Sequence, residues 1–383
     1  MKKSKYFLLL LSAFIFWGSF ISTFYLNFNK KLPFDIIMAS ILDWLLTMLV
    51  VFSVLSINTS SITNFNSNMF AKIKIVFERY SYLIYVLLFV TFVFVLQRID
   101  LILLGVTREE LVFDEDSNRF IMLLSSFFVF TCGVALSYQF KLIMKVMLII
   151  GILLVCTYNL SRSEIQTLLF VILICQIFIG ISLRKLLFFS LFSICIVSVV
   201  CLITIYQGRA DSMPTAFNDL YNSFFKYKAF SFYLSEFAIK KIEGDFEQIL
   251  YPFFGFFIER FLSAIEHVSN PISVQGSDFI STFRSLGSTS AFDANVLYPW
   301  WAWFYGLYGI IGIFIKSIYC FLILYGLSKS RFYFLYLYVL YVFLISSFYR
   351  HPLLNADSLY ALVSFIILDA FLIFVIKRIK FND

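Results

Sequence analysis

The sequence has little charge, few histidines and no cysteine outside an apolar run. Charged residues make up 14% of 383 positions, whereas soluble domains carry roughly 25%. Only two histidines and no CxxC pair are present, which argues against a histidine or cysteine metal site. The Walker, GxGxxG, HExxH and GxSxG motifs are also missing, so the common nucleotide, zinc and serine-hydrolase signatures are excluded. We therefore expect no cofactor and no metal.

Apolar residues are abundant instead, at 61% of the chain, and the mean hydropathy is +0.90. One water-soluble core cannot hide this much apolar surface, so we expect the solvent to be lipid. A helix needs about 20 apolar residues to cross a bilayer. By this criterion the sequence predicts an all-α, polytopic transmembrane helix bundle of about ten spans. They are expected near residues 6–28, 35–56, 81–97, 120–140, 142–160, 165–183, 186–207, 301–326, 332–348 and 359–376.

The distribution of Lys and Arg predicts the orientation of these spans. With the N-terminus inside, the inner segments and span ends hold fifteen basic residues and the short outer loops hold seven. Because basic residues accumulate in short cytoplasmic loops, this excess predicts that both termini lie in the cytoplasm. Lys30 and Lys31 run against the rule, and the orientation rests on the total.

The segment 208–300 is far longer than an ordinary connection and is predicted to be a periplasmic loop. Within it, 217–242 has the pattern of an amphipathic helix lying on the membrane surface or on the bundle. The apolar run 248–258 is too short to span and is broken by Pro252 and Gly255, so we expect it to be interfacial or re-entrant. The loop divides the chain into 1–207 (seven spans), 208–300, and 301–383 (three spans and a tail).

Polar side chains gather in four groups on the predicted outer face. Arg162 and Glu164, with Ser161 and Ser163, lie at the end of the fifth span, where they bind an anion or merely cap the next helix. Arg350, His351 and Asp357 share a short loop of a Phe-rich protein, a combination that favours function.

The other two groups have equally plain structural explanations. Arg209 and Asp211 follow the seventh span, where an arginine can snorkel to the headgroups. Arg284 lies in a polar stretch that a solvated loop also explains, and Arg260 is a further cation of the long loop.

Three ionisable residues fall inside predicted spans, namely Asp43, Lys316 and Asp369. A charge within the bilayer costs a few kcal/mol unless it is paired. Lys316 can pair with either aspartate, as a structural contact or as part of a proton relay.

The layout and several motifs resemble the bacterial O-antigen polymerases, the Wzy-type oligosaccharide repeat-unit polymerases. The dipeptide Ser161–Arg162 ends one helix and is followed directly by an apolar one. A long loop occupies the second half of the chain, and it closes with an aromatic stretch that runs into a Gly-rich helix start at 300–312.

The resemblance implies a glycosyltransferase at the periplasmic face of the bacterial inner membrane. It would move a growing glycan from an undecaprenyl-diphosphate carrier onto the next lipid-linked repeat unit. Membrane lipid, a chain-length-regulating co-polymerase and a flippase are then the expected partners, and nucleic acid is not. Arginines would stabilise the diphosphate leaving group. A carboxylate or His351 would accept the proton of the attacking hydroxyl. The resemblance thus implies a catalytic set and a substrate-binding set, respectively Arg162, Arg350, His351, Glu164 and Asp357, and Arg209, Asp211, Arg284 and Arg260.

Three alternatives remain open at this point. An O-antigen ligase shares the layout and passes the finished glycan to a lipid A core. A flippase or other transporter predicts charges along a path through the spans, where only Asp43, Lys316 and Asp369 lie. A non-catalytic membrane scaffold leaves the arginine groups unexplained.

Overall fold

The fold is described from a computed structural model of the chain. The residues that it describes are 2–25, 31–57, 67–103, 119–159, 161, 163–179, 194–195, 197–198, 200–202, 204–205, 210–243, 248–255, 257–258, 261, 265, 282, 284–285, 293–294, 297–354 and 356–378.

Among these residues, seven helices contain an apolar stretch long enough to cross a membrane, as expected for a membrane protein. They are α1 (Lys2–Tyr25), α2 (Phe34–Ile57), α4 (Ser81–Leu103), α6 (Arg119–Ser137), α7 (Leu142–Asn159), α15 (Trp300–Lys329) and α17 (Ala356–Arg378). All seven coincide with predicted spans, so the predicted all-α membrane bundle is confirmed at this level. A left-handed Gly309, with φ of 57°, kinks α15 near its start.

The remaining three predicted spans do not correspond to helices of full spanning length among the described residues. Two of them coincide with shorter apolar helices, α8 (Ser163–Ile179) and α16 (Tyr333–Tyr341), the second of which continues as the π-helix η4 (Val342–Ser346). The span expected at 186–207 lies largely outside the described residues. A bundle of ten spans therefore stays a prediction.

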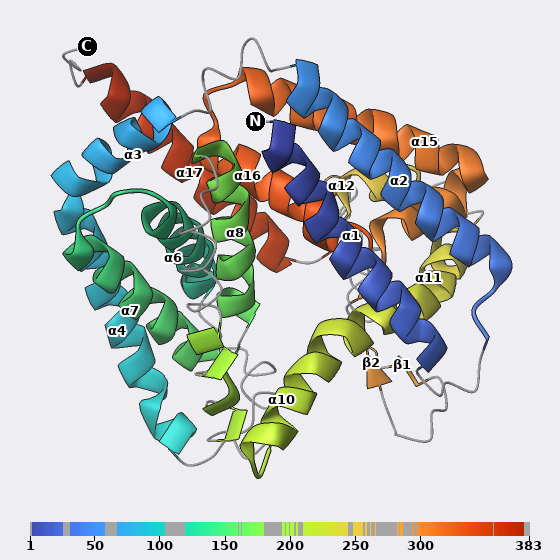
Figure 1. The fold of residues 1–383 in the computed structure, drawn as a ribbon, viewed down its shortest axis with the longest axis horizontal. Helices are drawn as coiled ribbons and strands as arrows, with labels where there is room; N and C mark the ends of the chain where they lie inside the picture. Colours follow the sequence, from blue (N-terminus) through green and yellow to red (C-terminus); the bar gives the residue numbers. More distant parts are fainter. Residues whose placement is uncertain are drawn as a thin grey trace.

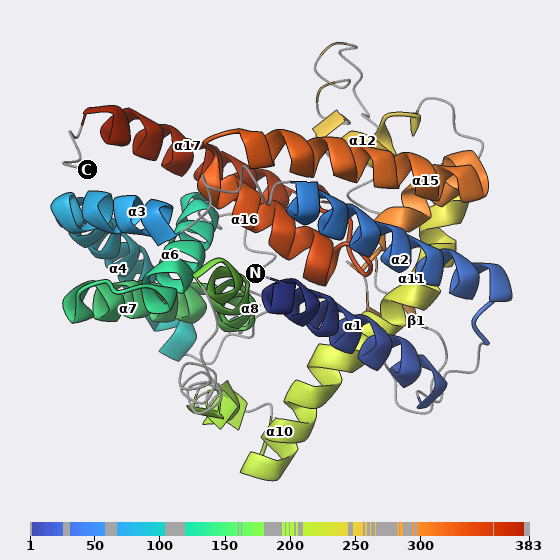
Figure 2. The ribbon, with the colours of Figure 1, turned by 45° about the horizontal axis from the view of Figure 1, so that its top comes forward.

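The helices form two groups that meet at α8 and α16 (Figures 1 and 2). One group contains α1, α2 and α15, with α2 and α15 side by side. The other contains α4, α6 and α7, which pack on one another and, through α6, on α8 and α17. The buried side chains are overwhelmingly apolar, and many large apolar side chains are exposed, as lipid-facing helices require.

One helix was not predicted. The segment Ser67–Arg79 forms α3, whose mean hydropathy is too low for a span. Its apolar residues recur at helical spacing and are buried against the bundle, for example Phe70, Ile73 and Phe77. The basic side chains between them remain partly or fully exposed.

The predicted amphipathic helix at 217–242 is confirmed as helix. The chain runs through α10 (Met213–Tyr221), the π-helix η2 (Asn222–Lys226) and α11 (Tyr227–Ile242). Both α11 and η2 lie against α1, and α11 also packs on α2 and α15, so these two parts of the segment rest on the bundle (Figure 1). Helix α10 extends away from it (Figure 2).

The run 248–258 contains the four-residue helix α12 (Tyr251–Phe254), which ends at Gly255 with φ of 51°. A side chain at Gly255 would collide with the Leu353 carbonyl, so glycine is required there on two counts. Two short strands, β1 (Arg284–Ser285) and β2 (Asp293–Ala294), form an antiparallel pair.

Candidate functional site

The structure describes only part of the predicted site. Arg162, Arg209 and Arg260 lie outside the described residues, as does the side chain of Asp357. Five of the predicted residues can therefore be placed, namely Glu164, Arg350, His351, Asp211 and Arg284.

Glu164 lies in the first turn of α8 and is 8% exposed. Its two carboxylate oxygens accept hydrogen bonds from Asn159 Nδ2 (3.1 Å) and Ser163 Oγ (3.2 Å). Since the Ser163 hydroxyl has one proton to give, the 2.7 Å contact between Ser161 Oγ and Ser163 Oγ must be donated by Ser161. The result is a directed chain of two hydroxyls that ends on a buried carboxylate.

A cavity of about 170 Å³ opens beside this carboxylate, between α6, α8 and α16. Glu164 is the charged residue of its lining, and the other members are hydroxyl-bearing or apolar. The lining consists of Ser125, Ser126, Val129, Phe130, Ser163, Glu164, Thr167, Tyr338 and Tyr341.

Arg350 is not part of the lining, but its charge influences tyrosines that are. Its charge acts on the hydroxyls of Tyr338 and Tyr341, both of which line the cavity, and on that of Tyr349. Tyr341 is hydrogen-bonded to Tyr349 and lies 3.3 Å from Thr167 Oγ1. The cavity that Glu164 lines therefore also contains two tyrosines that lie within reach of the charge of Arg350, a residue far from Glu164 in the sequence.

His351 is fully buried, and both of its ring nitrogens contact the backbone. Nδ1 accepts a hydrogen bond from the Leu353 amide at 2.9 Å, so the proton is on Nε2, which donates to the Pro252 carbonyl at 3.1 Å. Burial lowers the pKa of His351 to about 3. A neutral ring with both nitrogens engaged fits a structural role better than the predicted role of proton acceptor.

Arg284 and Asp211 do not line the cavity. Arg284 Nε donates to Tyr298 Oη at 3.0 Å and its guanidinium lies 4.6 Å from the centre of the Phe237 ring, which fastens the β1–β2 pair to α11. Asp211 is exposed, immediately before the Ser212 cap of α10.

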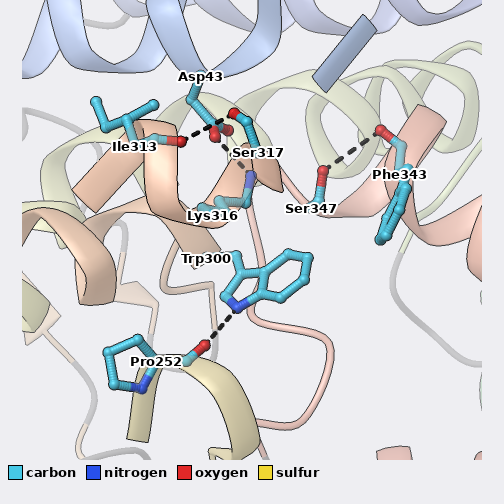
Figure 3. A network of polar contacts seen from close by, with 8 residues as sticks. All are labelled: Asp43, Pro252, Trp300, Ile313, Lys316, Ser317, Phe343 and Ser347. Atoms are coloured by element: carbon cyan, nitrogen blue, oxygen red, sulfur yellow. Dashed lines mark hydrogen bonds and ion pairs between the residues drawn. The ribbon is translucent and has the colours of Figure 1, made fainter. Parts of the chain in front are cut away.

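The charges inside the bundle resolve into two separate contacts. Lys316 Nζ pairs with Asp43 Oδ1 at 2.6 Å, and both side chains are buried (Figure 3). Lys316 also lies 5.0 Å from the centre of the Trp300 ring. Asp369 instead accepts three backbone N–H bonds at the start of α16, each of 2.9 Å. Of the two pairings that the sequence allowed, the structure has the one with Asp43.

Sequence reasoning overlooked Lys228, a buried lysine of α11. Its ammonium donates to the Phe224 carbonyl at 2.7 Å and faces the rings of Phe224 (4.0 Å) and Tyr349 (5.2 Å). Burial lowers its pKa to about 7. In the sequence it was indistinguishable from the other lysines of an amphipathic helix.

Within the described part of the chain, no group of three or more His, Cys, Asp or Glu side chains is arranged to hold a metal ion. The candidate site is thus a cavity with one buried carboxylate and several hydroxyls, two of which are influenced by the charge of an arginine. No protein-family model, curated protein or solved structure matches the chain.

Proposed function

We propose that this membrane protein is a glycosyltransferase that polymerises oligosaccharide repeat units carried on polyprenyl diphosphate. The observation that supports this most is a cavity lined by the Glu164 carboxylate and several hydroxyls, two of which, on Tyr338 and Tyr341, are influenced by the charge of Arg350. A group transfer between sugars needs a proton acceptor for the attacking hydroxyl and a cation for the leaving group. A carboxylate and an arginine are suited to these two tasks.

In the proposed reaction, a hydroxyl of the acceptor sugar attacks the anomeric carbon of the growing glycan. The new glycosidic C–O bond forms while the bond from that carbon to the diphosphate oxygen breaks, and polyprenyl diphosphate leaves with the electron pair. Glu164 accepts the hydroxyl proton, and Arg350 stabilises the charge that develops on the diphosphate. Arg162, which precedes Glu164 by two residues, is proposed as the second cation.

His351 is assigned to positioning in this proposal because its nitrogens already serve the backbone. The proposal keeps Asp357 as a further acid of the catalytic set and Arg209 and Arg260 as substrate-binding residues, as the resemblance implies. Arg284 retains the docking role that its contacts with Tyr298 and Phe237 support.

We further propose that the cavity faces the periplasm of a bacterial inner membrane and that both termini are cytoplasmic. The supporting observation is the excess of Lys and Arg in the segments assigned to the inside. Reporter fusions after Glu266 and after Lys380 test this directly. A cytoplasmic signal at Glu266 would contradict the orientation, and with it the outer position of the cavity.

The glycan profile of a deletion strain tests the function. Loss of long chains, with a single repeat unit still attached to the lipid core, is the expected result. A core without any repeat unit, together with accumulated polymer on the lipid carrier, would instead identify a ligase. An unchanged profile would reject both activities. Complementation with the intact gene and with Glu164→Gln then separates loss of the protein from loss of its chemistry.

A further inference from the structure

The cavity beside Glu164 has the chemistry of a carbohydrate subsite. Its volume of about 170 Å³ holds about five or six water molecules at roughly 30 Å³ each, or one pyranose ring in their place. Serine, threonine and tyrosine hydroxyls supply donors and acceptors, while Phe130 and the two tyrosines supply flat apolar faces. A sugar presents the same alternation, with hydroxyls around its edge and C–H groups on its faces.

The lining of the cavity carries negative charge only. Glu164 is the acid among the nine lining residues, and none of the nine is Lys, Arg or His. Each carboxylate oxygen already accepts one hydrogen bond, from Asn159 or Ser163. An ionised carboxylate has about four acceptor positions, so it still accepts from a ligand but has no proton to donate.

Arg350 is not one of the lining residues, so the lining itself contains no positive charge to balance Glu164. The charge of Arg350 influences the hydroxyls of Tyr338 and Tyr341, which do belong to the lining. A ligand in the cavity therefore contacts the carboxylate of Glu164 as the one charged group among the lining residues.

We infer that the cavity binds the acceptor-end sugar of the substrate and selects a sugar without a carboxylate. A neutral hexose donates its hydroxyl to Glu164, whereas a hexuronate brings a second negative charge and one hydroxyl fewer. The inference rests on the proposed function only in taking the ligand to be a carbohydrate. It adds a specificity that the proposed reaction does not require.

The test measures binding rather than turnover. The full-length protein in nanodiscs is exposed to methyl glycosides of glucose, galactose and mannose, to the matching uronates, and to the matching uronamides. Saturation-transfer NMR with competition ranks the affinities. The uronamide differs from the uronate in charge but hardly in size, so the comparison isolates the electrostatic effect.

We expect at least one neutral glycoside and its uronamide to bind, and the matching uronate to bind weaker by on the order of 10²-fold. That is the effect of two like charges about 5 Å apart at an effective dielectric constant near 20. Glu164→Gln should bring the uronate close to the uronamide. The matched control Glu243→Gln removes the same charge from an exposed position at the end of α11 and should leave the preference unchanged.

Three results would overturn the inference: no binding by any probe, equal binding of a uronate and its uronamide to the wild type, or an unchanged preference in a folded Glu164→Gln protein. If that variant does not fold, the wild-type comparison decides alone. The two proposals also fail separately. Selective sugar binding with a normal glycan profile in the deletion strain would reject the polymerase, while loss of long chains without selectivity would reject only the present inference.

Discussion

The buried ion pair between Lys316 and Asp43 allows a test of whether charges inside the bundle stabilise the fold or take part in activity. We expect Lys316→Met to reduce the amount of folded protein strongly, because it leaves the Asp43 carboxylate buried without its partner. The double variant Lys316→Met/Asp43→Leu should recover most of the loss, since an apolar pair of similar volume suits this environment.

The magnitude follows from the geometry of the pair. Opposite charges 2.6 Å apart attract by about 6 kcal/mol at an effective dielectric constant near 20. Much of this attraction offsets the cost of removing both ions from water, so the whole pair contributes little compared with an apolar replacement. Removing one partner is different, and costs about 3–5 kcal/mol because the remaining charge stays buried. The side chains of Lys316 and Asp43 are 0% and 1% exposed, so solvent cannot relieve it.

Immunoblots of membrane fractions and thermal melts in nanodiscs provide the two measurements. Lys329→Met is the matched control, because Lys329 lies on the same helix but is exposed at its end. It should leave abundance and melting temperature nearly unchanged. Wild-type abundance and melting of Lys316→Met, together with lost activity, would refute the structural interpretation and favour a role in proton transfer.

Three further outcomes follow from the proposed site. Arg162→Lys and Arg350→Lys should each lose a factor of roughly 10²–10³ in polymerisation at unchanged abundance, because a diphosphate clamp needs the guanidinium plane; near-normal glycan length on a gel would contradict the clamp. Glu164→Gln should lose a factor of about 10²–10⁴, the usual contribution of a general base, and long glycans in its complemented strain would reject that role. The pKa of His351 is held at about 3 instead of 6.5, so below pH 6.5 the unfolded chain binds a proton that the folded chain does not. The free energy of unfolding should therefore fall by about 1.4 kcal/mol for each pH unit below 6.5. Thermal melts of His351→Gln between pH 7 and 5 should lack this part of the pH dependence.

The spans were predictable because a bilayer imposes one length on every crossing helix. Windows of apolar residues therefore located α1, α2, α4, α6, α7, α15 and α17. The same criterion could not find α3, whose apolar residues form a stripe and whose mean hydropathy is low. Its signal was the helical spacing of Phe70, Ile73 and Phe77.

The sequence could single out the charged residues of the candidate site but not the way in which the site is assembled. Glu164 and Arg350 stand out in a sequence that is only 14% charged. Tyr341, Ser125 and Ser126 do not, because hydroxyl side chains are ordinary inside spans. Only the packing of α6, α8 and α16 shows that these hydroxyls share a cavity with Glu164.

The sequence likewise could not show which aspartate pairs with Lys316. Asp43 and Asp369 carry the same charge within predicted spans, so sign alone could not assign the partner of Lys316. The structure separates them by geometry, since Asp369 reaches the free N–H groups at the start of α16. The contacts of His351 were beyond the sequence for a similar reason, because composition marks a histidine but not the backbone groups around it.

The surroundings of His351 explain how the backbone of Arg350 is held. The Pro252 carbonyl accepts from both His351 Nε2 and Trp300 Nε1, which uses both of its lone pairs. The amide of His351 donates to the Tyr298 carbonyl at 2.9 Å, and the amide of Arg350 donates to the preceding turn at 2.8 Å. The backbone of Arg350 is therefore fixed from both sides by neutral hydrogen bonds.

This arrangement matters because a cation stabilises developing charge most when it does not have to move at the moment of reaction. Trp300, which shares the Pro252 carbonyl with His351, also lies over Lys316 of the buried ion pair. Trp300 thus connects the backbone that holds His351 to the ion pair between α2 and α15 (Figure 3). In the proposed enzyme, Arg350 supplies the charge and its neighbour His351 supplies the geometry, which accounts for an adjacent arginine and histidine without a proton transfer by the histidine.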